Sequence, residues 1–326
     1  MQQSLAPRNL STDALPAGVW GVVATPFQGS TLDVDLDSLS ELVEHYEAIG
    51  ATGLTVLGVF GEAAALTANE RRHVLETVVE CTSLPLVVGV TALATRPAIE
   101  EVRAAQEMAG GRLAAVMVQA NSARPDAVIA HLDAIHRATG AKVVLQDYPL
   151  ASGVSIATAA LISVVNTCPF VIAVKAEAPP TSVAIAELSA AVGVSIFGGL
   201  GGQGLLDELQ AGAAGAMTGF SYPEALIACV AAWRERGYEA ARTELLPYLP
   251  LINFEQQAKV ALAIRKECLR ERGLIKDSGV RAPAAGFPES LREAMHTHLS
   301  EAADALGNAT ATAQAQSPAL TTARSY

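Results

Sequence analysis

The sequence has few of the residues on which binding to nucleic acids or insertion into membranes depends. Of its 326 residues only 17 % are charged and 5 % aromatic, and the formal net charge is −11. Without a cluster of Lys and Arg, the chain cannot displace counterions from phosphates. It also has no run of the ~18 apolar residues that a membrane helix needs, and its first residues lack a basic start followed by an apolar segment. We therefore expect a cytoplasmic protein with no nucleic-acid or membrane partner.

Cysteine and histidine are also scarce. The four cysteines lie far apart without a CxxC spacing, which predicts neither a disulfide framework nor a zinc site: Cys81, Cys168, Cys229 and Cys268. The six histidines all fall in segments expected to be helical: His45, His73, His131, His136, His296 and His298. Because no histidine cluster is available, we expect no metal and no cofactor.

Apolar residues, by contrast, make up 51 % of the chain, enough for a large core. Eight short apolar runs follow one another, at residues 18–25, 53–58, 84–90, 114–118, 142–146, 170–175, 194–199 and 214–219. The segments between them have apolar residues at the i, i+3, i+4 spacing of amphipathic helices. Eight such units predict an α/β fold, a (β/α)8 TIM barrel with a C-terminal helical extension. A doubly wound open sheet is the alternative.

The two ends have weaker patterns than the middle of the chain. We expect a flexible segment at 1–17, the barrel at 18–220, a helical region packed on it at 221–305, and a disordered tail at 306–326. In a barrel, functional residues lie at the carboxyl ends of the strands.

Lys175 ends the sixth apolar run, FVIAVK, where another valine would fit. Side chains alternate along a strand, so Val171, Ala173 and Lys175 share a face of small residues. In a barrel interior, scarcity of water disfavours the ammonium form and favours a neutral, nucleophilic amine. A lysine that extends to solvent or pairs with Glu177 is the alternative.

Other strand ends also have chemically useful residues. Gly58 and Gly61 bracket a turn whose amides could hold a carboxylate, although an ordinary loop would have the same glycines. After the fifth run, Gln146 and Tyr148 share a face if the extended backbone continues, and a tyrosine there either relays protons or packs.

A glycine-rich stretch, GGLGGQG at 198–204, follows the seventh run and includes Gly199 and Gly201. It contains a formal G-x-G-x-x-G, but the next strand does not end in the acidic residue that dinucleotide binding requires. In a barrel such a loop predicts backbone amides open to a phosphate, a carboxylate or a sugar hydroxyl.

Taken together, ATPF (24–27), G-x-x-G-E (58–62), Q-D-x-P (146–149) and VKAE (174–177) resemble the dihydrodipicolinate synthase / N-acetylneuraminate lyase superfamily. The segments QDYPLASG, GAAGAMTGFSYPEA and LPLINFEQ are most similar to those of its 2-keto-3-deoxy sugar-acid dehydratases, in particular the L-2-keto-3-deoxyarabonate dehydratases. The resemblance implies a class I lyase on a TIM barrel, without a metal or cofactor, that is a homotetramer or homodimer. It also implies that Lys175 forms a Schiff base with a small 2-oxo acid.

The resemblance places the carboxylate of the 2-oxo acid on a loop made of Gly58, Val59, Phe60, Gly61 and Glu62. In the synthases and sialic-acid lyases this turn reads G-[TS]-T-G-E, so two hydroxyl groups are absent here. A third is lost further along the chain, where Gln146 replaces the tyrosine of a Y-N-x-P strand end. A lysine-biosynthesis synthase relies on those hydroxyls, so that activity is disfavoured.

These features predict dehydration of a 2-keto-3-deoxy sugar acid through a Lys175 imine and enamine. Tyr148 and Glu177 are the candidate proton carriers, and Gln146 and Asn121 are candidate orienting amides. Two alternatives stay open. One is a pyruvate-dependent aldolase or condensing enzyme with a less polar aldehyde partner, and the other is a protein that binds a 2-oxo acid or sugar acid without turnover.

Overall fold

Eight parallel strands form a closed barrel in the computed structural model, which describes the backbone of residues 10–316 and the side chains of residues 10–309. The strands are β1 (Gly18–Val22), β4 (Gly53–Val56), β5 (Leu86–Gly89), β6 (Leu113–Gln119), β7 (Val143–Asp147), β8 (Val171–Ala176), β9 (Ser195–Gly198) and β10 (Gly215–Thr218). β1 pairs with both β10 and β4, which closes the sheet. Each strand lies within or overlaps one of the eight apolar runs, so the predicted (β/α)8 barrel is confirmed.

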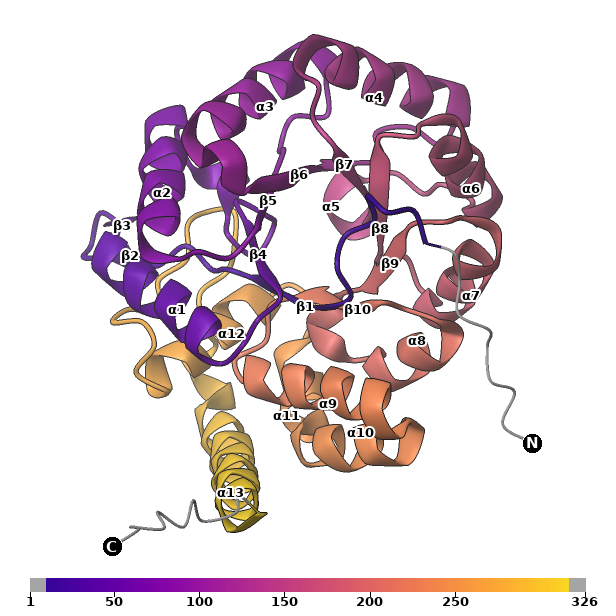
Figure 1. Ribbon diagram of the computed structural model, residues 1–326. Helices are drawn as coiled ribbons and strands as arrows, with labels where there is room; N and C mark the ends of the chain where they lie inside the picture. Colours follow the sequence, from indigo (N-terminus) through magenta and orange to yellow (C-terminus); the bar gives the residue numbers. More distant parts are fainter. Residues whose placement is uncertain (1–9, 317–326) are drawn as a thin grey trace, which may run out of the picture.

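An outer ring of helices surrounds this barrel (Figure 1). Its members are α1 (Leu36–Ala48), α2 (Ala68–Cys81), α3 (Thr95–Ala109), α4 (Pro125–Thr139), α6 (Thr158–Thr167), α7 (Thr181–Ala191) and α8 (Leu205–Ala211). A short hairpin of β2 (Phe27–Gln28) and β3 (Asp33–Val34) precedes α1, and a single turn, α5 (Pro149–Ser152), follows β7. Helix α2 begins with a capping box, because the Thr67 hydroxyl accepts from the Glu70 amide while the Glu70 carboxylate accepts from the Thr67 amide.

The register of the strands decides which side chains point into the barrel. Gln146 is paired with Lys175 across β7 and β8, and Lys175 is paired with Phe197 across β8 and β9. Paired residues of parallel strands point to the same face, so these three side chains all point into the barrel. Ala173 is two residues earlier on β8 and therefore lies below Lys175, as the alternation predicts.

Five further helices follow the barrel strands: α9 (Pro223–Arg236), α10 (Tyr238–Leu245), α11 (Leu249–Glu255), α12 (Ala261–Glu271) and α13 (Arg292–Gln316). They enclose a second apolar core. Helix α9 follows β10 and packs on β1 and β10. It is therefore the eighth helix of the barrel, although it lies within the range 221–305 that the sequence assigned to the extension.

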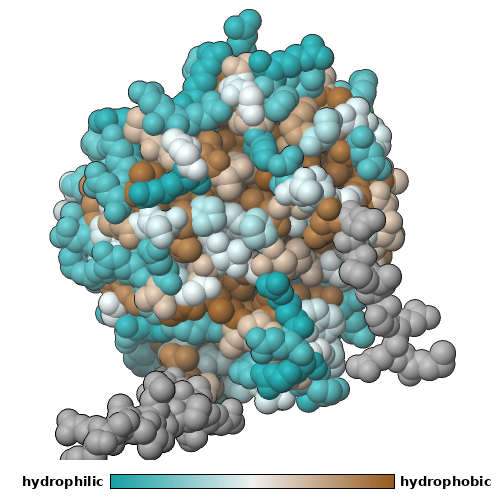
Figure 2. All heavy atoms as spheres, in the orientation of Figure 1, coloured by the Kyte–Doolittle hydropathy of each residue, from teal (hydrophilic) through white to brown (hydrophobic). Residues whose placement is uncertain are grey.

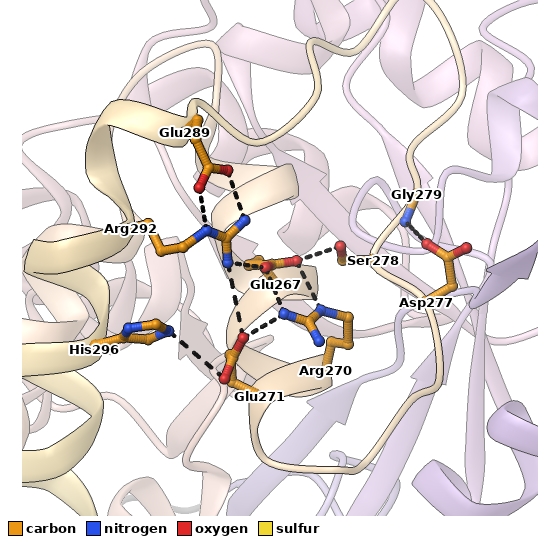
Figure 3. Close-up of polar contacts among 9 residues, drawn as sticks. All are labelled: Glu267, Arg270, Glu271, Asp277, Ser278, Gly279, Glu289, Arg292 and His296. Atoms are coloured by element: carbon orange, nitrogen blue, oxygen red, sulfur yellow. Dashed lines mark hydrogen bonds and ion pairs between the residues drawn. The ribbon is translucent and has the colours of Figure 1, made fainter.

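An ion network holds α12 against α13. Figure 3 shows Arg292 of α13 and Arg270 of α12 directed at the Glu267 carboxylate, with nitrogen–oxygen distances of 2.7 and 2.8 Å. Glu267 is only 3 % exposed, and the hydrogen bonds from its two arginines and Ser278 hold its pKa at about 2 against the effect of burial. The network therefore fixes the orientation of α12, whose other side faces the barrel.

The described parts of the two termini differ from the prediction. Leu15 is buried, and its backbone N–H donates to Ile172 while the Ser195 hydroxyl donates to its carbonyl, so this part of the expected flexible segment lies across the amino-terminal end of the barrel. At the other end α13 extends to Gln316, so residues 306–316 are helical rather than disordered. Residues 1–9 and 317–326 lie outside the described residues.

The amino-terminal end of the barrel faces the viewer in Figure 1, where the segment leading into β1 crosses in front of the strands. In Figure 2 the same face has hydrophilic residues gathered around its periphery and apolar residues nearer its centre. The carboxyl ends of the strands, where the candidate residues lie, are on the opposite face.

Candidate active site

Lys175 lies near the end of β8 and is buried, with 5 % of its surface exposed. Its Nζ is 3.1 Å from Oε2 of Glu177, whose side chain is also buried. The environment of the amine is therefore not purely apolar, and the pairing with Glu177 that the sequence left open is present. The two residues are two positions apart, so both point into the barrel.

The Glu177 carboxylate is fixed by groups from β7 as well. Gln146 donates from Nε2 to the same Oε2 at 2.7 Å, and the Glu177 backbone N–H donates to the carbonyl of Asp147 at 2.9 Å. This backbone bond continues the pairing of β7 and β8 beyond the last residue of β8. The result is a rigid cluster in which one carboxylate oxygen faces both an amine and an amide.

Tyr148 and Asp147 follow Gln146 in the chain. Burial, together with the negative charge of Glu177, raises the pKa of the Tyr148 hydroxyl, so this group keeps its proton and can act as an acid. Burial raises the pKa of Asp147 to about 6, to which Glu177 contributes, and Oδ1 of Asp147 has no hydrogen-bond partner in the described part of the chain. The three candidates Lys175, Glu177 and Tyr148 are therefore brought to one region.

The glycine-rich loop after β9 accommodates side chains from other elements. A Cβ on Gly199 would overlap Oε1 of Glu177, and a Cβ on Gly201 would overlap Nε2 of Gln256. The Gly201 amide donates to the Thr218 hydroxyl at 2.8 Å and is not open to a ligand. The expectation that this loop offers its amides is thus wrong at Gly201, where the absence of a side chain makes room for neighbouring groups.

A cavity of about 630 Å³ reaches this cluster at Gln146, while Lys175, Glu177 and Tyr148 are not among the residues that line it. Gln146 lines it together with Gly58, Val59 and Glu62 of the loop after β4, and Gln119 comes from β6. Val59 is 47 % exposed at the mouth of the cavity. The loop after β4 and the strand end at Gln146 therefore border one space, as the resemblance implies.

Glu62 is held by the C-terminal region. It has a left-handed backbone with φ of 51°, its Oε1 accepts from Lys266 Nζ at 2.9 Å, and its Oε2 accepts from the Arg281 backbone N–H at 2.8 Å. Both carboxylate oxygens are thus occupied, although Glu62 borders the cavity. Its contacts indicate that it ties the loop after β4 to α12.

Phe60, Gly61 and Asn121 do not join the cluster around Lys175. Phe60 is buried against Gly219, where a Cβ would overlap its ring, and the carbonyl of Gly61 accepts from the Thr25 hydroxyl at 2.7 Å. Nδ2 of Asn121 donates to the carbonyl of Leu93 at 2.8 Å. Of the two apolar loop residues only Val59 borders the cavity.

Two polar residues of the barrel interior are not among those that the sequence indicated. Oγ1 of Thr55 and Oε1 of Gln119 are buried without a hydrogen-bond partner among the described residues. Thr55 is the only polar residue of β4, a local signal that could have found it.

Arg265 on α12 was missed as well, although a sequence signal exists. Arg265, Lys266 and Glu267 are consecutive within ALAIRKECL. Because successive residues of a helix are about 100° apart, these three cannot all face solvent on a buried helix.

No group of three or more His, Cys, Asp and Glu able to hold a metal ion occurs within residues 10–309. The six histidines all lie in helices, as the sequence predicts: His45 in α1, His73 in α2, His131 and His136 in α4, and His296 and His298 in α13. The four cysteines are free thiols, as the sequence predicts.

Comparison with known proteins places this arrangement in a family. The sequence profile described as the dihydrodipicolinate synthetase family matches residues 15–302. The chain belongs to this family. Members of the dihydrodipicolinate synthetase family are lyases, and the protein is therefore a lyase on a TIM barrel.

Relatives of the chain include a dehydratase and a hydratase-aldolase. The chain is 31 % identical over 279 residues to an L-2-keto-3-deoxyarabonate dehydratase of Azospirillum brasilense, covering 82 % of this chain and 88 % of the relative. It is 39 % identical over 94 residues to a trans-O-hydroxybenzylidenepyruvate hydratase-aldolase of Pseudomonas putida, covering 26 % of this chain and 28 % of that protein.

Solved structures of the family have the same fold. A dihydrodipicolinate synthase from Rhodopseudomonas palustris superposes with a TM-score of 0.81 at 29 % identity, covering 90 % of this chain and all of that one. A sialic acid aldolase from Ruminococcus gnavus, at 20 % identity and a TM-score of 0.78, covers 90 % of this chain and 97 % of its own and supports the fold alone. Among the described residues no helix is long and apolar enough to span a membrane, and the cytoplasmic location stays a prediction.

Proposed function

We propose that the protein dehydrates a 2-keto-3-deoxy sugar acid through an imine on Lys175. The observation that carries the proposal is the buried Lys175 amine, 3.1 Å from a carboxylate oxygen that Gln146 also holds, beside a cavity at the carboxyl ends of the strands. The 31 % identity with an L-2-keto-3-deoxyarabonate dehydratase extends over most of both chains and supports this choice of reaction.

Imine formation needs the amine without its proton. Glu177 is positioned to accept a proton from the Lys175 ammonium, because its Oε2 is the nearest carboxylate oxygen. The neutral amine then attacks C2 of the 2-oxo acid, and Glu177 returns the proton to the C2 oxygen as it leaves as water. This gives a protonated imine and restores the Glu177 carboxylate. The Thr55 hydroxyl can donate to an oxygen of the acid inside the barrel, and the free Oε1 of Gln119 can accept from a substrate hydroxyl.

Dehydration follows from the electron demand of that imine. It acidifies C3, and Glu177 takes the C3 proton to form the enamine. Electrons returning from the enamine form a double bond between C3 and C4 and expel the C4 hydroxyl, which leaves as water with a proton from Tyr148. Since burial keeps Tyr148 protonated, this residue suits the role of acid. Hydrolysis of the imine then releases the product and the free amine.

A second candidate is a pyruvate-dependent aldolase, in which the bond between C3 and C4 breaks and an aldehyde leaves. The observation that favours it is Val59, an exposed apolar residue at the mouth of the cavity where the sialic-acid lyases have a hydroxyl. An apolar wall suits an aldehyde with few hydroxyls. The 39 % identity with a hydratase-aldolase supports it over a quarter of the chain.

Borohydride reduction tests the imine. We expect pyruvate or a 2-keto-3-deoxy acid to leave, after reduction, a stable adduct on the peptide that contains Lys175, and none in a Lys175→Arg variant. Absence of an adduct with every 2-oxo acid tried, on folded protein, would contradict the proposal. Products then decide between the reactions. Dehydration gives a 2-oxo-3-enoic acid, which tautomerises through its C5 hydroxyl to a 2,5-dioxo acid or its semialdehyde, and cleavage gives pyruvate with an aldehyde.

A further inference from the structure

Arg265 of α12 lies over the carboxyl-terminal face of the barrel. Its guanidinium carbon is 5.5 Å from the centre of the Phe60 ring in the loop after β4. Its Nη2 is 3.5 Å from the position that a Cβ on Gly201 would occupy in the loop after β9. A residue of the C-terminal region thus stands where two loops of the barrel meet, although the extension follows all eight strands in the sequence.

The guanidinium of Arg265 lacks a hydrogen-bond partner. Its side chain is 12 % exposed and its Nε is fully buried, yet no acceptor in residues 10–309 bonds to that nitrogen. The nearest carboxylate oxygen, Oε2 of Glu255, is 3.8 Å away, and both oxygens of that carboxylate accept hydrogen bonds from Ser221. The arrangement therefore leaves donors of Arg265 available for an acceptor that is not part of the chain.

Glu255 neutralises this charge only in part. Burial raises the pKa of Glu255 to about 7, because Arg265 and Ser221 offset only part of the cost of removing the carboxylate from water. The Glu255 carboxyl is therefore harder to ionise than an exposed one, and its nearest oxygen is 3.8 Å from the guanidinium, beyond hydrogen-bond distance. A buried cation without a full counter-charge is strongly unfavourable, so its presence at a loop junction indicates a site for an anion.

Gln256 adds a second donor beside Arg265. Its Nε2 is buried, has no partner in the described part of the chain, and lies against Gly201. A guanidinium and an amide nitrogen offer donors only, so their complement is a group made of acceptors. A carboxylate has two such oxygens in the geometry that a guanidinium matches, and it supplies the missing negative charge.

This donor pair lies against the same loop as the imine-forming cluster. Gly199 packs against Oε1 of Glu177, and Gly201, two residues later, packs against Nε2 of Gln256 and Nη2 of Arg265. The loop after β9 therefore leads from the Lys175–Glu177 pair to Arg265. A group bound at Arg265 would belong to the end of the substrate remote from its 2-oxo carbon.

We propose that Arg265 and Gln256 bind a second carboxylate at the far end of the substrate, so that the protein acts on a 2-oxo diacid. This inference rests on the proposed imine at Lys175. It assigns the substrate to the 2-keto-3-deoxy diacids rather than to sugar acids that end in a hydroxymethyl group, because a neutral hydroxyl would leave the Arg265 charge uncompensated.

Two 2-oxo acids test whether Arg265 and Gln256 bind a second carboxylate. Pyruvate has one carboxylate and 2-oxoglutarate has a second one at its far end. We expect borohydride trapping on Lys175 to be half-saturated at a concentration of 2-oxoglutarate at least tenfold lower than the concentration of pyruvate that is needed. In Arg265→Met this preference should disappear while trapping of pyruvate stays within about twofold of wild type. The matched control is Arg272→Met, whose guanidinium already pairs with Glu224 at 2.7 Å and which should keep the preference.

Protein stability supplies an independent reading. Among the described residues Arg265 makes no hydrogen bond and only a 3.8 Å ion-pair contact with Glu255, so replacing this buried cation by an apolar side chain should leave the Tm of Arg265→Met equal to or above that of wild type. A lower Tm, with equal losses of trapping for both acids, would indicate a structural role and overturn the proposal. Unchanged preference for 2-oxoglutarate in Arg265→Met would overturn it as well.

Glutarate separates this inference from the imine. It has two carboxylates but no ketone, so it cannot form an imine adduct. We expect calorimetry to show that glutarate binds wild type and that its affinity for Arg265→Met is at least tenfold lower. If wild type forms no adduct with any 2-oxo acid but binds glutarate more tightly than Arg265→Met does, the proposed imine is wrong and the proposed carboxylate site is supported. If glutarate binds both proteins equally, the carboxylate site fails.

Discussion

The amine of Lys175 and the carboxylate of Glu177 lie 3.1 Å apart inside a barrel whose strands are otherwise mainly apolar. The same oxygen of Glu177 accepts a hydrogen bond from Gln146, so the carboxylate cannot rotate away from the amine without losing a second contact. The proton that must leave the lysine before imine formation therefore has an acceptor already in place.

Replacing Glu177 by Gln should slow turnover without preventing imine formation. The amide keeps the shape of the side chain but cannot accept the C3 proton, so we expect kcat to fall about 100-fold, a loss typical of a missing general base. Borohydride trapping on Lys175 should still occur at high pH. The control is Glu187→Gln on the exposed face of α7, which should retain full activity. Full activity of Glu177→Gln would remove Glu177 from the mechanism.

Gly199→Ala should displace the Glu177 carboxylate, because the new Cβ would overlap Oε1. We expect at least a tenfold loss of kcat, since a small displacement of a reacting group is costly. Circular dichroism should show an intact fold. Gly111→Ala, which places its Cβ in open space, is the matched control and should be neutral. Equal activity of the two variants would show that the position of Glu177 is not critical.

Lys266→Met should destabilise the protein because it leaves the buried Glu62 carboxylate without its ion-pair partner, which lies 2.9 Å away. We expect the free energy of unfolding in urea to fall by about 3 kcal/mol. The double variant Glu62→Gln with Lys266→Met should recover part of this loss. The exposed pair of Asp133 and Arg137 provides a control, since Asp133→Asn should change the free energy by less than about 1 kcal/mol. Additive losses would exclude coupling.

Glu208 should make stability depend on pH. Burial raises the pKa of its carboxyl to about 7, against 4.5 for the unperturbed group, although the Thr181 hydroxyl donates to it at 2.7 Å. Between those two pH values the folded state binds more protons than the unfolded state, so stability falls as pH rises. Relative to wild type, Glu208→Gln should gain on the order of 3 kcal/mol between pH 5 and pH 8. A constant difference across this range, measured by urea unfolding, would contradict the assignment.

Much of the fold could be predicted because strands and helices leave local patterns. The run KVVLQ predicted β7, and FVIAVK predicted β8 with Lys175 above Ala173, because alternation along a strand depends only on neighbouring residues. The capping box of Thr67 and Glu70 is local in the same sense, since both halves of the motif lie within one turn. Predictions of this kind need no knowledge of distant parts of the chain.

Predictions that depended on distant residues were less accurate. Glu62 looked like a substrate-binding residue, but its partners are Lys266 and Arg281, about 200 residues later in the chain. The resemblance places Phe60 in the loop that holds the carboxylate of the 2-oxo acid, whereas its ring packs on Gly219 and lies against Arg265. No local pattern encodes such contacts.

The sequence by itself determined the eight repeated units, the small-residue face on which Lys175 stands and the absence of clustered histidines. It did so because periodicity and spacing are local properties of the chain. Only the tertiary structure decided which carboxylate meets the Lys175 amine, which loop glycines make room for Glu177 and Gln256, and that Arg265 reaches the barrel mouth. These depend on how a closed barrel and a later helix bring remote segments together, and the free energy of packing the whole chain sets that geometry.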